Sequence, residues 1–177
     1  MQISSTARIA HPLDRVYLAY RDDLPALAPY LPDVSHIVVD RRTERDGGVD
    51  LLNIWHASTR IPSVAKAFVR PEMLRWEDHA SWDDAATLAR WKLIVPAFRN
   101  QVTCTGETRI KADGAGARVE LVGDLQIDLS RLPGMNRFVG KRMAPQVEAF
   151  IVKLISPNLQ RVNAALESYL DDKYGKA

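Results

Sequence analysis

Asp78, His56 and Asn53 are the polar residues best placed to do chemistry in this sequence. They fall in two strand-like runs, 49–58 and 73–82, in which most of the alternate residues are apolar. A carboxylic acid and an imidazole in an apolar surrounding could move protons as a general acid and base. If Asp78 is buried, it must be paired, hydrogen-bonded or protonated. Asp78 and His56 are therefore the candidates for catalysis. The commoner alternative for His56 is a partly exposed position on the wet face of the sheet.

The sequence contains no common catalytic motif that would strengthen this enzyme hypothesis. There is no G-x-S-x-G, no H-E-x-x-H and no G-x-x-x-x-G-K-[ST], and the four histidines are scattered. Cys104 is the only cysteine, which excludes an internal disulfide and a cysteine-based zinc site. We expect no metal and no cofactor.

Three tryptophans stand at matching positions in three strand-like runs. Trp55, Trp76 and Trp91 are each in phase with apolar neighbours, so they are predicted to share one face of a sheet. Indoles on such a face can either fill a core or line a pocket. If they line a pocket, Asn53 and Asp78 are its expected polar groups.

These residues are positioned by a simple order of elements. Residues 2–10 alternate as a strand, and residues 11–22 and 23–31 have the spacing and prolines of two short helices. Six strand-like runs follow, at 34–44, 49–58, 73–82, 86–95, 101–112 and 117–129, and the chain ends in about 30 helical residues. Short turns between one-sided strands indicate an antiparallel meander. Nothing divides the chain, so we expect one domain, 1–177.

Successive turns of a meander lie at alternate ends of the sheet, and here the two ends differ. The turns at 45–48, 83–84 and 113–116 are short and acidic or glycine-rich. The connections 59–72, 96–100 and 130–145 carry large apolar and basic side chains, among them Phe68, Phe98, Met135, Phe138, Arg131, Arg137, Lys141 and Arg142. The apolar residues could simply plug the core, or they could form a gate whose basic ring attracts an anionic head group or an anionic membrane surface.

The C-terminal helix contains Pro157, which removes a backbone donor at a cost of roughly 3 kcal/mol or more. A bend there would let the first half of the helix lean over a cavity. We then expect Phe150, Ile151, Leu154 and Asn158 to face that cavity. An inert kink on a solvated flank explains the proline equally well.

The order of elements, the run HPLDRVYLAYRD after the first strand and the long last helix resemble the START/Bet v 1-like superfamily, also called SRPBCC or polyketide cyclase-like. This resemblance implies an α+β helix-grip fold, in which a curved antiparallel sheet of about seven strands wraps around the C-terminal helix. It also implies a cavity for lipids, sterols, polyketides or other apolar molecules.

Our leading hypothesis is a carrier or sensor of a small hydrophobic or amphipathic ligand. The alternative is an enzyme of the cyclase, aromatase or dehydratase kind, which would be a lyase or isomerase and would use the same cavity. A third hypothesis is a regulatory protein that binds a protein partner through its basic, apolar end. An interior acid with a raised pKa beside a histidine would favour catalysis, and an apolar interior would favour carriage. The expected ligand-binding residues are Asn53, Trp55, Phe68, Trp76, Trp91, Phe98, Met135, Phe138, Phe150, Ile151, Leu154 and Asn158.

The bulk composition sets the remaining expectations. The 46% hydrophobic and 26% charged residues are an ordinary globular balance, and the net charge of +2 is too small to favour nucleic acid. The N-terminal segment has no basic stretch followed by an apolar one, so we expect no signal peptide and a cytoplasmic location.

Overall fold

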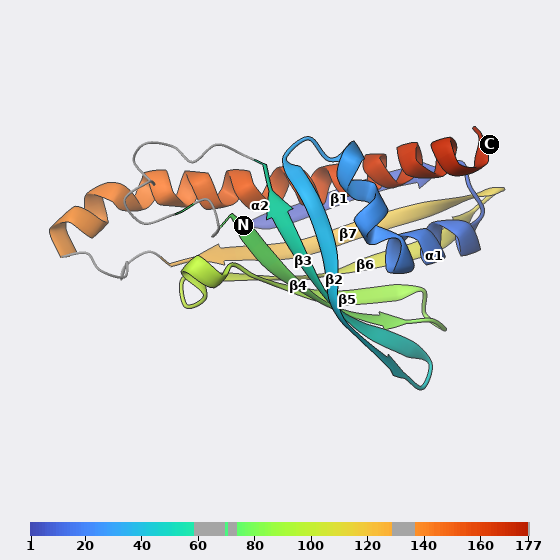
Figure 1. Ribbon diagram of the computed structural model, residues 1–177, viewed down its shortest axis with the longest axis horizontal. Helices are drawn as coiled ribbons and strands as arrows, with labels where there is room; N and C mark the ends of the chain where they lie inside the picture. Colours follow the sequence, from blue (N-terminus) through green and yellow to red (C-terminus); the bar gives the residue numbers. More distant parts are fainter. Residues whose placement is uncertain (59–69, 71–73, 129–136, 177) are drawn as a thin grey trace.

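The computed structural model describes residues 1–58, 70, 74–128 and 137–176, and within the last range it describes the side chains from residue 144 onward. Its centre is an antiparallel sheet of seven strands in the order β1-β7-β6-β5-β4-β3-β2 (Figure 1). The strands are β1 (Gln2–Ile9), β2 (Val34–Arg45), β3 (Gly48–Ala57), β4 (Arg75–Asp83), β5 (Leu88–Ile94), β6 (Val102–Asp113) and β7 (Gly116–Ile127). The predicted antiparallel meander is confirmed.

Three helical elements cover the inner face of this sheet. They are α1 (Leu13–Asp22), the 3-10 helix η1 (Leu24–Tyr30) and the long α2 (Arg137–Tyr174), which runs along the whole sheet (Figure 1). A separate 3-10 turn, η3 (Pro96–Phe98), lies between β5 and β6. The hydrophobic core lies between the sheet and these helices, with Ile9, Leu27, Ile110, Ile151 and Leu166 fully buried. This is the predicted α+β helix-grip arrangement.

Strand alternation explains why the inner face is apolar. In β4 the burial alternates from residue to residue, so that every second side chain points into the molecule. The hairpin turns lie together at the end of the sheet away from η3 (Figure 1). Gly47 and Gly114 hold positive φ angles of 72° and 64° in two of them, which suits glycine. The predicted grouping of the short turns at one end is therefore confirmed.

Two boundaries differ from the sequence-based expectation. The segment predicted as a short helix at 23–31 forms a 3-10 helix over Leu24–Tyr30, with i to i+3 hydrogen bonds from Ala26 to Asp23 and from Leu31 to Ala28 at its ends. Part of the predicted connection 130–145 is helical, since α2 begins at Arg137. The helix then continues through Pro145 and Pro157 without interruption, so Pro157 does not break it.

Side-chain contacts fasten the end of α2 to the first third of the chain. His11 Nε2 lies 2.9 Å from Asp171 Oδ1, and the Tyr30 hydroxyl donates to Asp172 over 2.8 Å. Lys173 and Tyr169 both donate to Asp23. These contacts place the second half of α2 firmly over the sheet. No helix among the described residues is both long and apolar enough to cross a membrane.

Candidate functional site

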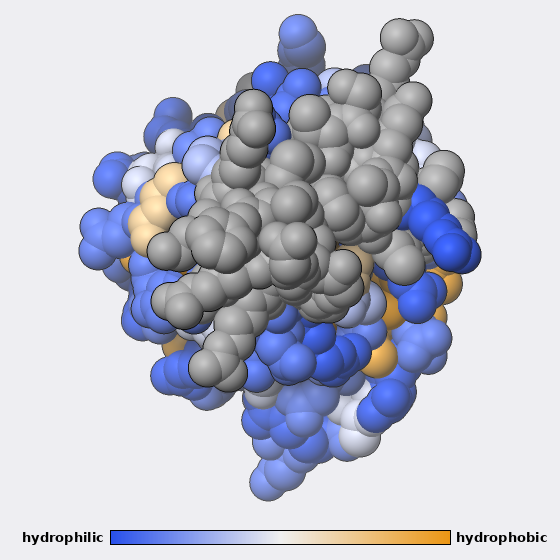
Figure 2. Space-filling model, turned by 90° about the vertical axis from the view of Figure 1, so that its left-hand side faces the viewer, coloured by the Kyte–Doolittle hydropathy of each residue, from blue (hydrophilic) through white to orange (hydrophobic). Residues whose placement is uncertain are grey.

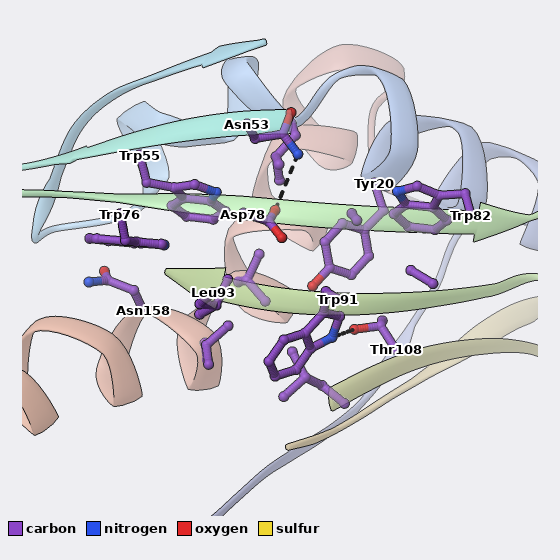
Figure 3. A pocket seen from close by; sticks show the side chains of 16 residues that line it. Tyr20, Asn53, Trp55, Trp76, Asp78, Trp82, Trp91, Leu93, Thr108 and Asn158 are labelled. Carbon is purple, nitrogen blue, oxygen red and sulfur yellow. Dashed lines mark hydrogen bonds between the residues drawn. The ribbon is translucent and has the colours of Figure 1, made fainter. Parts of the chain in front are cut away.

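A cavity lies between the inner face of the sheet and the helices α1, η1 and α2. Sixteen side chains of the described residues line it, and all four tryptophans of the chain are among them (Figure 3). The lining residues are Tyr20, Leu24, Asn53, Trp55, Trp76, Asp78, Ala80, Trp82, Ala89, Trp91, Leu93, Thr108, Leu121, Asn158, Leu159 and Val162. The wall is thus mainly apolar and aromatic, with a few polar groups, which is the usual make-up of a small-molecule site.

The pairing of β3 with β4 builds the polar corner of the cavity. Trp55 is paired with Trp76 and Asn53 with Asp78, so two indoles and two polar side chains stand in adjacent rows. The indoles of Trp55 and Trp76 stack with ring centroids 5.4 Å apart and an angle of 21° between their planes. Asn53 Nδ2 donates to Asp78 Oδ2 over 3.2 Å (Figure 3).

Asp78 is a buried carboxyl that has no cationic partner among the described residues of the cavity wall. Only 8% of the residue is exposed, and no Lys, Arg or His is among the described lining residues. Burial raises the pKa of Asp78 to about 6, because removal from water disfavours the charged form. The neighbouring donors of Asn53 and Trp55 act in the opposite direction on this pKa. Asp78 can therefore gain or lose a proton near neutral pH.

Three further polar atoms of the wall are buried and lack a hydrogen-bond partner among the described residues. They are the donor Trp55 Nε1 and the acceptors Asn53 Oδ1 and Asn158 Oδ1. Although the Trp55 indole lowers the pKa of Asp78, its N–H makes no well-aligned hydrogen bond to the carboxyl. Buried polar atoms are nearly always paired in folded proteins. These three are therefore free to bond a molecule that enters the cavity.

The side-chain amide of Asn158 is oriented by a hydrogen bond to the backbone of its own helix. Its Nδ2 donates to the carbonyl of Leu154, one turn earlier, over 3.0 Å. Since a carbonyl can only accept, this contact fixes which end of the amide is nitrogen. The amide oxygen is the unpaired atom.

Two glycines make room for the indole of Trp91. Trp91 is paired with Gly106, which is in turn paired with Gly123 on β7. A Cβ atom at either glycine would overlap the indole ring. The Trp91 N–H donates to Thr108 Oγ1 over 3.1 Å, which holds the ring against the glycines (Figure 3).

The cavity in this structure is small. Its volume is about 40 Å³. Since one water needs roughly 10–15 Å³ by this measure, the space holds about three water molecules, or about 90 Å³ of liquid. It accommodates a small molecule or a head group, and a larger ligand requires the wall to move outward.

The structure brings together six of the predicted site residues: Asn53, Trp55, Trp76, Asp78, Trp91 and Asn158 all line the cavity. Four others, Phe98, Phe150, Ile151 and Leu154, are buried in the core but are not part of this wall. Phe68, Met135 and Arg131 lie outside the described residues, as do the side chains of Phe138, Arg137, Lys141 and Arg142. The gate and the basic ring therefore stay predictions.

The placement of His56 corrects the sequence analysis. Because strand residues alternate, His56 points away from the cavity that its neighbour Trp55 lines. On the outer face its ring stacks on that of His36, with centroids 4.1 Å apart. His79 is also on the outer face, beside Glu77. No histidine of the described wall stands near Asp78, so His56 is withdrawn as a catalytic candidate.

Sequence reasoning missed Tyr20, Trp82 and Thr108, all of which line the cavity. Trp82 could have been found, because it is in phase with Trp76 and Asp78 further along β4. Tyr20 lies on the buried stripe of α1, and its place in the wall depends on how that helix packs. Thr108 carried no signal that separates it from other strand threonines.

The end of the molecule at which η3 lies is seen face-on in Figure 2. The described surface around it is mainly hydrophilic, with a few separate hydrophobic groups. Arg99, from the connection that contains η3, pairs with Glu77 over 3.3 Å.

No protein-family model matches the sequence, and no curated protein matches it either. Solved structures do match in shape. Protein TTHA0849 of Thermus thermophilus superposes with a TM-score of 0.68 at 21% identity, over 98% of this chain and 99% of its own. The Zhui aromatase/cyclase of Streptomyces sp. R1128 follows with 0.62 at 17% identity, over 98% and 95%.

Truncated norcoclaurine synthase of Thalictrum flavum matches with a TM-score of 0.55 at 12% identity, over 96% of this chain and 92% of its own. The neighbours are of the START/Bet v 1-like helix-grip type, so the predicted fold is confirmed. At these identities the likeness shows the fold alone.

Proposed function

We propose that this protein binds a small hydrophobic or amphipathic molecule in the cavity between the sheet and α2, as a carrier or sensor. One observation carries the proposal: a cavity walled by every tryptophan of the chain contains three buried polar atoms that have no hydrogen-bond partner among the described residues. Leaving such atoms unpaired costs stability, typically about 1–3 kcal/mol each. A ligand would pair them and bury its apolar part against the indoles.

The driving force for binding is transfer of apolar surface from water, at roughly 25 cal/mol per Å². The polar corner formed by Asn53, Trp55 and Asp78 would then select among ligands of similar size. Leu159 and Val162 on α2 form the opposite wall. A small outward movement of α2 would enlarge the cavity for a longer ligand.

Native mass spectrometry of the protein as purified from cells tests this function. We expect a bound small molecule that is lost when the same sample is denatured. The control is Ala80→Leu, which fills the cavity from β4, where Ala80 is 7% exposed. Absence of a bound species from both proteins, even after incubation with a cell extract, would contradict the proposal. If Ala80→Leu carried as much bound molecule as the unaltered protein, the ligand would bind outside this cavity.

A second candidate function is favoured by the raised pKa of Asp78. A carboxyl that titrates near pH 6 can act as acid or base at physiological pH. Among the neighbours in fold is an aromatase/cyclase, so a proton transfer in a cyclisation or dehydration is the reaction class to test. The molecule recovered from Asp78→Asn would then differ chemically from the one recovered from the unaltered protein. Identical molecules from both proteins would favour carriage.

A further inference from the structure

We propose that the ligand of this cavity carries an ammonium group on an apolar body, and that Asp78 is its counter-ion. This inference rests on the proposed ligand-binding function and names the class of ligand that the site takes. It follows from the charges, the hydrogen-bonding atoms and the size of the cavity.

The described wall of the cavity contains an acidic side chain but no basic one. Asp78 is the only acid among the described lining residues, and none of them is a base. A buried carboxylate without a cation is costly, and the cost disappears when a cation is supplied. Because the described wall supplies none, an ammonium ligand would complete the pair.

The unpaired atoms point to the same class. Asn53 Oδ1 and Asn158 Oδ1 are buried acceptors of the same wall as the Asp78 carboxylate. An ammonium group has three donors and no acceptor, so it suits a wall in which acceptors outnumber donors. The one unpaired donor, Trp55 Nε1, could serve a hydroxyl or carbonyl elsewhere in the ligand. A carboxylate or phosphate ligand would instead meet mainly acceptors and a like charge.

Aromatic walls and limited size complete the argument. A cation within reach of indole and phenol rings is attracted by their electron-rich faces. Trp55, Trp76, Tyr20 and Trp91 stand around Asp78 in Figure 3. Room for about three waters is room for a small alkylammonium group.

Three other titratable groups face or adjoin Asp78. Burial raises the pKa of Tyr20 well above its usual value and that of Cys104 to about 12, so both stay neutral near pH 7. His79, on the outer face, lowers the pKa of Asp78 through its charge. Within the described wall, Asp78 is thus the group whose charge changes between about pH 5 and pH 8.

The test uses three probes that differ in charge: butylamine, 1-butanol and butanoate. Tryptophan fluorescence reports binding, because every indole of the chain lines the cavity. At about pH 8 we expect butylamine to bind tightest and butanoate weakest. Asp78→Asn should lower the affinity for butylamine by about tenfold to a hundredfold. It should change the affinity for 1-butanol by less than about threefold. Glu77→Gln, the preceding residue on the outer face of β4, is the matched control and should change neither.

The pH dependence adds an independent readout. Butylamine stays protonated, as a lysine side chain does, while a proton competes with it for Asp78. Its affinity should fall about tenfold for each pH unit below about 6, and 1-butanol should show no such fall. Tighter binding of 1-butanol or butanoate than of butylamine would overturn the ammonium assignment and leave the ligand-binding function standing. No response to any probe would contradict that function itself.

Discussion

The buried carboxyl of Asp78 should make the ligand-free protein less stable as the pH rises. For an acid whose pKa is raised on folding, the folded state holds its proton more tightly than the unfolded chain. The pKa of Asp78 is 3.8 in the unfolded reference and about 6 in the structure. Stability is therefore lost as the pH rises from about 4, and the loss is complete somewhat above 6.

The magnitude follows from these two values. At about 1.4 kcal/mol per pKa unit, the full cost of ionised Asp78 is about 3 kcal/mol at pH 8 and only about 0.6 kcal/mol at pH 4. Asp78→Asn removes the titrating group. Its stability relative to the unaltered protein should therefore increase by roughly 2–3 kcal/mol between these two pH values.

The assay is urea unfolding of both proteins at several pH values, followed by tryptophan fluorescence and without added ligand. Glu77→Gln serves as the control, because its side chain lies on the outer face of the same strand. If the free energies of unfolding of Asp78→Asn and of the unaltered protein changed in parallel with pH, Asp78 would not be the buried acid described here.

Three further predictions concern two contacts of the structure and the basic segment found in the sequence. Gly123→Ala should destabilise the protein by about 1–3 kcal/mol, because the new methyl overlaps the Trp91 ring; unchanged urea midpoints would contradict this packing. His11→Ala should cost about 2–3 kcal/mol in thermal unfolding, since His11 is buried and contacts Asp171; a loss below about 0.5 kcal/mol would show that this contact does not fasten α2. Reversing the basic charges of segment 131–142 should weaken binding to anionic vesicles by about 1 kcal/mol per charge, with neutral vesicles as control; equal sedimentation of both proteins would refute a membrane role.

The fold could be predicted from the sequence because local pattern and tertiary role agree in most elements. Alternation in 73–82 placed Trp76 and Asp78 on the inner face, and β4 has them there. The same rule should have excluded His56, whose neighbour Trp55 was already assigned inward. Periodicity of two fixes the face of every residue in a strand once one is known.

The cavity itself could be predicted only in part. Helix periodicity predicted that the Asn158 side chain faces inward. It could not show that the amide nitrogen donates to the carbonyl of Leu154. Nor could it show that Phe150 and Leu154 pack in the core while Leu159 and Val162 line the cavity. These distinctions depend on the curvature of the sheet and on where α2 crosses it, which no local pattern records.

The most direct test of the account is a ¹⁵N–¹H spectrum of the tryptophan indoles during addition of butylamine and then of 1-butanol. We predict a saturable shift that is largest for the Trp55 N–H, which makes no hydrogen bond within the described part of the chain, and smaller for Trp91, which already donates to Thr108. The cavity-filled Ala80→Leu should show neither shift. If no indole signal moves with either probe, or if Ala80→Leu responds equally, the cavity is not a ligand site.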